Sequence, residues 1–369
     1  MNSNNFPQSW KTVKLGEVTT YIKGKKPGIY LDSSQGNVLP YLTAESLRKG
    51  KPDKWCNADD DIVKVDEDDI IFIWDGSNSG DTFTGFYGVL ASTMVKIMPK
   101  TSDVSKNFLY YSLKKNFKLF NSTTTGTSIP HVSRPVFVSL RVPRPPLQEQ
   151  HKIADILSTV DDVIQKTDEI ISKTEELKKG LMQMLLTRGI GHTRFKKTEI
   201  GEIPEEWKIR KMNEVTEIIG GGTPSTKNKD YWNGNIPFVT PTDITKLKGN
   251  FLTYTEKSIT DKALKNTSAK LIPEGSILMT SRATIGFCAI NHVQVVTNQG
   301  FANYICKENI YNLYLLYFLM SIKQRLIALA SGSTFKEISR KSLRKLKIPL
   351  PPFPEQQKIA DILFMVDEK

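Results

Sequence analysis

The most regular spacing of apolar residues lies in the middle of the chain, at residues 148–188. Apolar or small residues recur there at alternating steps of four and three, which is the spacing of a heptad seam. The stretch contains no proline and a single glycine, and it follows a proline-rich hinge, so we predict one continuous helix. The seam consists of Ile156, Val160, Val163, Thr167, Ile170, Thr174, Leu177, Leu181 and Met184.

Shorter patterns on both sides of this helix predict mixed structure. Runs rich in β-branched residues at 69–74 and 276–280 are bounded by Gly, Asp and Asn, which indicates strands. Residues 107–118 and 311–329 place apolar side chains three and four positions apart, as helices do. We therefore predict an α+β fold in which two similar domains, each with a mixed β-sheet and short helices, are joined by long coiled-coil helices.

The two flanking regions repeat each other. Residues 10–18 recur as 207–215 at an offset of 197, and residues 140–157 recur as 346–363 at an offset of 206. The order of the matching segments never changes, so the chain is an internal duplication.

The duplication divides the chain into predicted segments. The second copy of the helix starts like the first but stops at Lys369, so it is too short to cover the seam of the first helix. We predict a truncated or shortened form whose exposed seam docks on another subunit or on a second copy of the chain. The predicted segments are domain 1 at 1–147, the spacer helix at 148–190, domain 2 at 191–352 and the start of the distal spacer helix at 353–369. The predicted docking residues are Ile156, Val160, Val163, Ile170, Leu177 and Leu181.

The distribution of charge indicates which parts approach a polyanion. The net charge is +12, and residues 1–147 carry 19 Lys and Arg against 14 Asp and Glu, whereas residues 189–352 carry 24 against 13. Residues 148–188 carry 6 against 8, so the excess positive charge belongs to the two domains, as expected for proteins that bind DNA. No window is long and apolar enough for a membrane helix and no signal peptide is evident, so we expect a cytoplasmic protein.

Three motifs resemble those of Type I restriction-modification specificity subunits. One is the element Pro-x-Pro-Pro-x-x-Glu-Gln-x-Lys-Ile-Ala-Asp-Ile-Leu, which occurs twice, and the others are the loop at 220–225 and the segment at 297–301. The likeness covers nearly the whole chain. It implies a pseudo-twofold molecule in which each domain reads half of a split double-stranded DNA sequence and the helices set the gap. It also implies methyltransferase subunits that dock around the helices and restriction subunits that complete a nuclease.

Glycine-rich loops in both domains carry the candidate DNA contacts. Reading a duplex needs donors and acceptors for base edges and cations for phosphates, and these loops supply both. Arg282 is the leading candidate for a base contact because its planar guanidinium can bond guanine at two points. The candidates are Lys25, Ser77, Asn78, Thr82, Thr127, Thr223, Ser225, Lys227, Ser281, Arg282, Thr284, Asn298, Gln299 and Lys336.

Catalytic motifs are not evident in the sequence. The loop at 220–224 lacks the Gly-Lys-Ser/Thr ending of a phosphate-binding loop, and the cysteines and histidines are too scattered for a zinc site. The acidic stretch at 59–69 is predicted to be a solvated loop. We expect no enzyme, no metal and no bound cofactor, with S-adenosylmethionine, ATP and magnesium implied by the resemblance for partner subunits. Two alternatives stay open: a repeat-built protein-interaction scaffold with incidental basic charge, and an enzyme with an unrecognised site.

Overall fold

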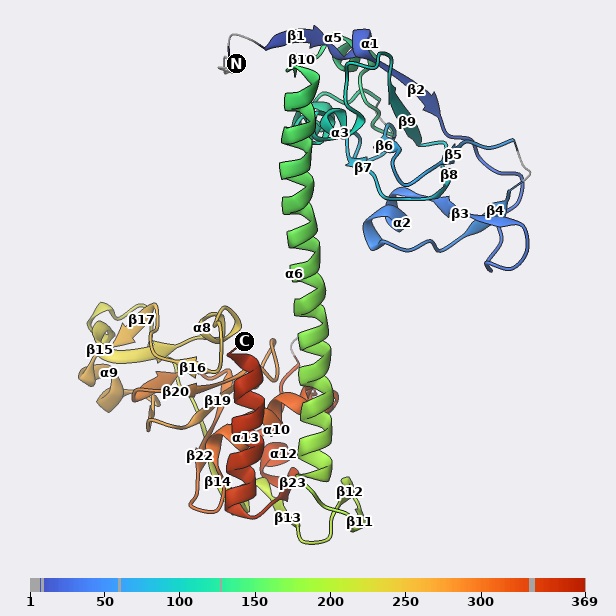
Figure 1. The fold of residues 1–369 in the computed structure, drawn as a ribbon. Helices are drawn as coiled ribbons and strands as arrows, with labels where there is room; N and C mark the ends of the chain where they lie inside the picture. Colours follow the sequence, from blue (N-terminus) through green and yellow to red (C-terminus); the bar gives the residue numbers. More distant parts are fainter. Residues whose placement is uncertain (1–6, 8–9, 59–60, 127, 332–335, 369) are drawn as a thin grey trace. The chain divides into compact units, whose positions relative to one another are not determined.

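The longest helix of the chain passes through both of its compact units. The computed structural model describes residues 7, 10–58, 61–126, 128–331 and 336–368. Contacts divide the chain into unit 1, Met1–Thr167, and unit 2, Asp168–Lys369, and the division falls inside helix α6 (Leu147–Arg188). The prediction of one long helix is thus confirmed, and Figure 1 shows it unbroken. The predicted domain boundaries stay predictions.

Unit 1 contains two four-stranded sheets and a two-stranded ladder. Its strands are β1 (Lys11–Lys14), β2 (Thr19–Lys23), β3 (Val38–Leu42), β4 (Trp55–Asn57), β5 (Lys64–Val65), β6 (Ile70–Ile73), β7 (Thr82–Phe83), β8 (Gly88–Leu90), β9 (Met94–Pro99) and β10 (Arg141–Arg144). One sheet has the order β2-β9-β6-β7 and the other β4-β3-β8-β5, while β1 pairs with β10. All the pairs are antiparallel except β3 with β8.

Strand β6 connects the two hydrophobic cores of unit 1. Because successive side chains of a strand point to opposite faces, Phe72 packs in one core and Ile71 and Ile73 pack in the other. Phe72 makes edge contacts with Phe120 and Phe137, at centroid distances of 5.3 and 5.6 Å. The helices of unit 1 besides α6 are α1 (Leu15–Val18), α2 (Ala44–Lys49), α3 (Lys106–Lys115), α4 (Phe117–Ser122) and α5 (Arg134–Ser139).

Unit 2 repeats this plan with a fifth strand in one of its sheets and an added hairpin. Its strands are β11 (Phe195–Thr198), β12 (Gly201–Pro204), β13 (Lys208–Lys211), β14 (Thr216–Gly220), β15 (Trp232–Val239), β16 (Phe251–Leu252), β17 (Lys257–Ile259), β18 (Leu271–Ile272), β19 (Ile277–Thr280), β20 (Cys288–Asn291), β21 (Val295–Thr297), β22 (Phe301–Cys306) and β23 (Lys347–Leu350). The sheets have the orders β14-β22-β19-β20-β16 and β17-β15-β21-β18. Strand β13 pairs with β23, and β11 pairs with β12 in the hairpin.

Helix α13 (Phe353–Asp367) is embedded in the main core of unit 2. Its Ile359 and Leu363 share one apolar cluster with Leu185 and Leu186 from the last turns of α6. Figure 1 shows α13, in red, beside this end of α6 and beside α10. The other helices are η1 (Lys229–Tyr231), α7 (Met212–Val215), α8 (Pro241–Thr245), α9 (Asp261–Asn266), α10 (Asn312–Ser321), α11 (Lys323–Ala328) and α12 (Arg340–Lys345), so the helix predicted at 311–329 is divided at Ile322.

The predicted duplication is visible in the sheet topology. Order β2-β9-β6-β7 in unit 1 corresponds to β14-β22-β19-β20 in unit 2, and order β4-β3-β8-β5 corresponds to β17-β15-β21-β18. The parallel pair β3 with β8 has its counterpart in β15 with β21. The α+β prediction with two similar domains is therefore confirmed.

The predicted apolar seam of α6 is largely exposed. Ile156, Val163 and Ile170 are 65%, 58% and 63% exposed, and Leu177 is 56% exposed. Leu181 is half-buried against the core of unit 2. The expectation that part of the seam lies open is confirmed, while the role of these residues in docking stays a prediction.

Candidate nucleic-acid interface

Four segments of unit 2 that are distant in sequence meet in one cluster of loops. The loop after β14 is tied to the loop between β21 and β22, because Gly222 N donates to the carbonyl of Thr297 at 2.9 Å. In addition, the hydroxyl of Thr223 donates to the side-chain carbonyl of Gln299. This arrangement brings two of the predicted polar loops together.

The loop between β19 and β20 joins the same cluster through backbone hydrogen bonds. Ser281 N donates to the carbonyl of Gly300 at 2.8 Å, and Ile338 N donates to the carbonyl of Ser281 at 2.9 Å. The backbones of Arg282 and Glu337 form an isolated antiparallel β-bridge, and Ala283 N donates to the carbonyl of Lys336 at 3.1 Å. The backbone on both sides of Arg282 is therefore held by hydrogen bonds. We name this set the unit 2 loop cluster.

The glycine run at the end of β14 is required by this close approach. A Cβ added to Gly221 would lie 2.0 Å from the carbonyl oxygen of Asn298, and one added to Gly222 would lie 2.7 Å from that of Ser268. Both distances are far below van der Waals contact, so only glycine fits. The glycines of the loop at 220–225 thus allow it to pack closely against the neighbouring loops.

Most predicted site residues of unit 2 are on the surface of this cluster. Asn298 is half-buried, and its side-chain oxygen accepts from Gly300 N at 2.9 Å. Ser281 is only 4% exposed, so its side chain is covered. The exposed candidates are Thr223, Ser225, Lys227, Arg282, Thr284, Gln299 and Lys336. Their contact with DNA stays a prediction.

Unit 1 has an equivalent cluster of loops built on the same backbone bonds. Val132 N donates to the carbonyl of Trp74 at 2.9 Å, as Ile338 N does to Ser281 in unit 2. The backbones of Asp75 and His131 form an isolated antiparallel β-bridge, as those of Arg282 and Glu337 do in unit 2. We name this set the unit 1 loop cluster.

The predicted site residues of unit 1 are less uniformly exposed than those of unit 2. Lys25 is exposed and pairs with Asp61 at 2.7 Å, and Ser77 is exposed. Thr82 is 4% exposed, and its hydroxyl donates to the carbonyl of Gly80 at 3.3 Å. Asn78 is half-buried. Thr127 lies outside the described residues.

Sequence reasoning missed several polar residues of the unit 1 cluster. Asp75 pairs with Lys23 at 3.1 Å, and His131 and Arg134 line a cavity of about 470 Å³ next to Trp74. The signal that could have identified Asp75 was the repeat itself, because the matching backbone position in unit 2 holds Arg282. The two clusters therefore place opposite charges at one position of a shared framework.

The acidic stretch of unit 1 is only partly the solvated loop that was predicted. Asp66, Glu67 and Asp68 are exposed, but Asp69 is 4% exposed and forms ion pairs with Lys96 and with Lys106. Its burial alone would raise the pKa of this carboxyl, but the N–H of Asp66 and the two lysines outweigh that effect and lower the pKa. The prediction was wrong for Asp69 because the residue directly precedes strand β6 and its side chain is buried there.

In residues 10–58, 61–126, 128–331 and 336–368, no cluster of His, Cys, Asp and Glu could hold a metal ion. Over the same part of the chain, no helix is both long and apolar enough to span a membrane. Burial raises the pKa of the Cys288 and Cys306 thiols to about 12, so both stay protonated at neutral pH.

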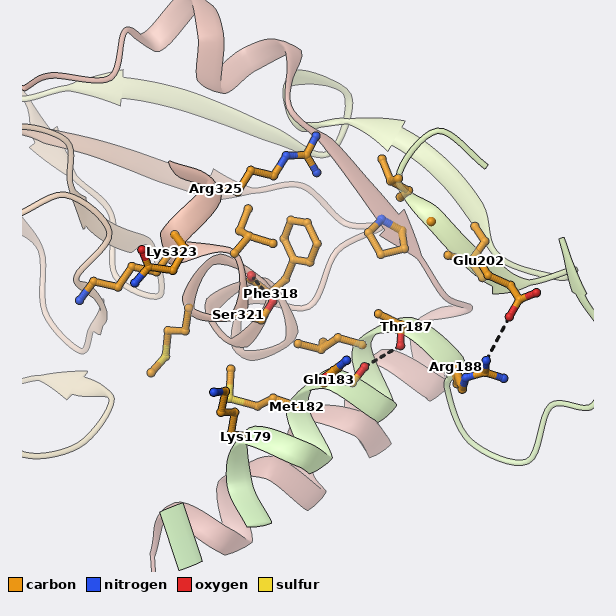
Figure 2. Close-up of a pocket in the computed structure, with 18 of the residues that line it drawn as sticks. Lys179, Met182, Gln183, Thr187, Arg188, Glu202, Phe318, Ser321, Lys323 and Arg325 are labelled. Atoms are coloured by element: carbon orange, nitrogen blue, oxygen red, sulfur yellow. Dashed lines mark hydrogen bonds and ion pairs between the residues drawn. The ribbon is translucent and has the colours of Figure 1, made fainter. Parts of the chain in front are cut away.

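A separate pocket of about 830 Å³ lies in unit 2 between the end of α6, hairpin β11–β12 and the junction of α10 with α11. Figure 2 shows Lys179 and Met182 of α6 on one side of the pocket, and Phe318 of α10 and Arg325 of α11 on the other. Leu186, Ile203 and other apolar side chains complete the floor. Neither Lys179 nor Arg325 forms an ion pair with any described residue. The pocket therefore has an apolar floor and a cationic rim.

The family model and the similar proteins all indicate one family. The Type I restriction modification DNA specificity domain matches residues 7–176 and 204–369. The Type I restriction enzyme MjaVIII specificity subunit of Methanocaldococcus jannaschii is 34% identical, with 100% of this chain and 88% of that relative covered. The EcoR124I/EcoR124II specificity subunit of Escherichia coli is 33% identical over 45% of this chain and 41% of its own length.

Solved structures show a similar fold. The S subunit of a Type I restriction-modification system from M. genitalium has a TM-score of 0.64 at 15% identity, with 100% of this chain and 91% of that chain covered. A chain from a study of complex assembly and conformational transition of the type I R-M system has a TM-score of 0.54 at 20% identity, with 98% and 91% covered. At these identities the likeness concerns the fold.

Proposed function

Because the chain belongs to the family of Type I restriction-modification specificity subunits, we propose that each of its two units reads one half of a split sequence in double-stranded DNA. Proteins of this family are the DNA-recognition component and not the catalytic one. The observation that carries the proposal is the pair of loop clusters, in which one backbone framework presents Asp75 in unit 1 and Arg282 in unit 2.

The side chains at this shared position favour different bases. A guanidinium donates two hydrogen bonds to guanine O6 and N7, whereas a carboxylate accepts from the amino group of cytosine. Arg282 therefore favours guanine, and Asp75 favours cytosine when it is released from Lys23. Exposed Lys227 and Lys336 beside the unit 2 cluster supply cations for phosphates, and each phosphate contact would make binding more dependent on salt.

The test is methylome sequencing of cells that carry this chain with its cognate methyltransferase. We expect methylation at a two-part sequence, with Arg282→Ala relaxing one half and Asp75→Ala relaxing the other. Lys208→Ala, at an exposed position of β13 outside both clusters, is the matched control and should leave the sequence unchanged. A single undivided sequence, or two variants that relax the same half, would rule the proposal out.

We also propose that methyltransferase subunits dock on the apolar seam of α6 and in the pocket at its C-terminal end. Five of the six predicted docking residues are exposed and Leu181 is half-buried, and the pocket combines an apolar floor with a cationic rim that suits an acidic amphipathic segment of a partner. Restriction subunits would join this assembly. S-adenosylmethionine, ATP and magnesium would be bound by the partner subunits, and the site of action would be the cytoplasm, where prokaryotic DNA lies.

Assembly can be measured by light scattering of the purified chain mixed with its methyltransferase. We expect Ile170→Asp, at a 63% exposed seam position, and Arg325→Glu, at the pocket rim, to weaken assembly. Lys208→Glu is the control for a change of surface charge. If the chain instead forms a dimer of itself that Ile170→Asp dissociates, the occupant of the seam is a second copy and the docking proposal fails.

A further inference from the structure

Helices α6 and α13 each begin with a buried glutamine. Gln150 is the fourth residue of α6 and Gln356 the fourth residue of α13, and each is 1% exposed. Buried glutamine is uncommon unless all its hydrogen-bonding atoms have partners, because its amide otherwise loses the hydrogen bonds it makes to water. The partners of these two residues are therefore informative.

Gln150 makes three hydrogen bonds to backbone atoms in unit 1. Its side-chain oxygen accepts from Ser105 N at 2.8 Å. Its amide nitrogen donates to the carbonyl of Asp103 at 2.9 Å and to that of Pro145 at 2.8 Å. The amide thereby connects the start of α6 to the turn that precedes α3.

Gln356 repeats the same three bonds in unit 2. Its side-chain oxygen accepts from Tyr311 N at 2.9 Å, and its nitrogen donates to the carbonyls of Asn309 at 3.1 Å and Pro351 at 3.0 Å. Every partner is displaced by 206 positions from its counterpart in unit 1, which is the offset of the repeat in this region. The connection between unit and helix was therefore duplicated as a whole.

A second contact further along each helix repeats as well. The hydroxyl of Tyr111 on α3 donates to Asp161 at 3.1 Å, and that of Tyr317 on α10 donates to Asp367 at 2.7 Å. Burial raises the pKa of Tyr111 and of Tyr317, and the neighbouring carboxylates raise it further, so both phenols stay protonated and can donate. A rod held at one point can pivot, whereas a rod held at two points about 16 Å apart, eleven residues along a helix, has a defined direction.

Apolar packing alone does not hold the start of α6 against the rest of unit 1. Ala154 is the one buried apolar side chain of α6 before Thr167, and Ile156, Val160 and Val163 on this part of the helix are exposed. Hydrogen bonds have a preferred direction, so they can fix the angle between a helix and its unit. Apolar contacts have no preferred direction and define that angle less strictly.

We propose that Gln150 and Gln356, together with the Tyr111–Asp161 and Tyr317–Asp367 contacts, are positioning residues that set the direction in which each recognition unit is held on its helix. We name these two sets of contacts the exit joints. The inference rests on the proposed reading of a split DNA sequence. Under it, the exit joints determine how strictly the gap between the two half-sites is measured, while the loop clusters determine which bases are read.

The test uses the full chain assembled with its methyltransferase. The two half-sites, read beforehand from the methylome of the wild type, are cloned at the native gap and at gaps one base pair longer and shorter, and the methylated fraction of each is measured. The variant Gln150→Met keeps the length of the side chain and removes its amide. His151→Met is the matched control, because His151 is the next residue and is exposed.

We expect Gln150→Met to raise methylation at the altered gaps, relative to the native gap, by about tenfold or more, because all three hydrogen bonds of the buried amide are lost. The bases preferred in each half-site should not change, and His151→Met should behave as the wild type. A change in base preference without a change in gap tolerance would overturn the inference.

A milder variant keeps the inference testable if Gln150→Met fails to fold. Tyr111→Phe removes only the hydroxyl that donates to Asp161 and should raise the methylated fraction at altered gaps in the same direction, by about two- to fivefold. A folded Tyr111→Phe complex with the wild-type gap ratio would overturn the inference. A wild-type complex with no gap preference would overturn the proposed function, and the exit-joint inference with it.

Discussion

Units 1 and 2 have one framework but hold it together with different chemistry. In unit 1, the carboxylate of Asp69 lies between Lys96 of β9 and Lys106 of α3. In unit 2, the equivalent strand and helix positions hold the neutral side chains of Asn303 and Asn312. Asn312 still ties its helix to the turn before the strand, because its amide donates to the carbonyl of Gly275 at 3.0 Å.

The difference shows that the backbone register carries the fold and that the side chains on it can be exchanged. The residue before each central strand is Asp69 in unit 1 and Ser276 in unit 2, and each caps a turn, with Asp69 accepting from Asp66 N at 2.9 Å and Ser276 donating to the carbonyl of Pro273 at 2.8 Å. The same exchange occurs in the loop clusters, where it changes the chemistry offered to a ligand. A duplicated framework can therefore acquire two specificities without a change of fold.

The largest difference between the two units is expected when the carboxylate of Asp69 is removed from unit 1. Asp69→Ala leaves two lysine ammonium groups without their buried carboxylate, and we expect the free energy of unfolding of unit 1 to fall by about 3–5 kcal/mol. The matched change Ser276→Ala in unit 2 removes one hydrogen bond and should cost about 1 kcal/mol. Hydrogen exchange of the β6 and β19 amides would separate the two units, and equal losses would contradict the comparison.

A second prediction contrasts the two helices. Leu363 of α13 is fully buried, so Leu363→Ala should lower the free energy of unfolding of unit 2 by about 3 kcal/mol through the cavity it leaves. Val160 of α6 is 49% exposed, so Val160→Ala should change that of unit 1 by less than about 0.5 kcal/mol. Urea denaturation of the isolated chain measures both values. A large loss for Val160→Ala would mean that this face is covered in the isolated chain.

A third prediction sharpens the contrast between the loop clusters. Arg282→Lys keeps the positive charge but loses the planar fork, so discrimination at one base pair should fall by about 2 kcal/mol while overall affinity changes little. Competition binding with duplexes that differ at single positions measures the effect. Loss of affinity for all duplexes alike would assign Arg282 to phosphate contact instead.

The smallest effect concerns acid sensitivity, because protonation keeps the Asp69 side chain in place. The pKa of Asp69 is lowered in the folded chain, so its stabilisation is fully present above its unfolded pKa, about 3.9, and is lost as the pH falls through the lower folded value. Unit 2 has Ser276 at this position. We expect hydrogen exchange in β6 to accelerate on acidification more than in β19, and Asp69→Asn should abolish the difference.

The sequence predicted those features that depend on short-range periodicity or on comparison of the two copies. The seam spacing indicated α6, and the repeated segments indicated two similar α+β units. Both signals can be recognised from residues that are close in sequence or that align between the two copies. The glycine-rich loops also led to residues that gather in the unit 2 loop cluster, and their contact with DNA stays a prediction. They did not reveal that Ser281 and Thr82 are covered.

Only the tertiary structure decided which distant residues meet. Gln150 stood inside the repeated element, but its partners Asp103 and Ser105 are more than 40 positions away, and no local pattern connects them. In the sequence Asp69 could not be distinguished from the neighbouring acidic residues, and only the folded chain shows that it pairs with Lys96. Local periodicity is set by bonds between near neighbours, whereas burial and pairing of charges arise when loops close. The sequence therefore determined the framework, and the folded chain determined which residues meet at the helix joints and in the loop clusters.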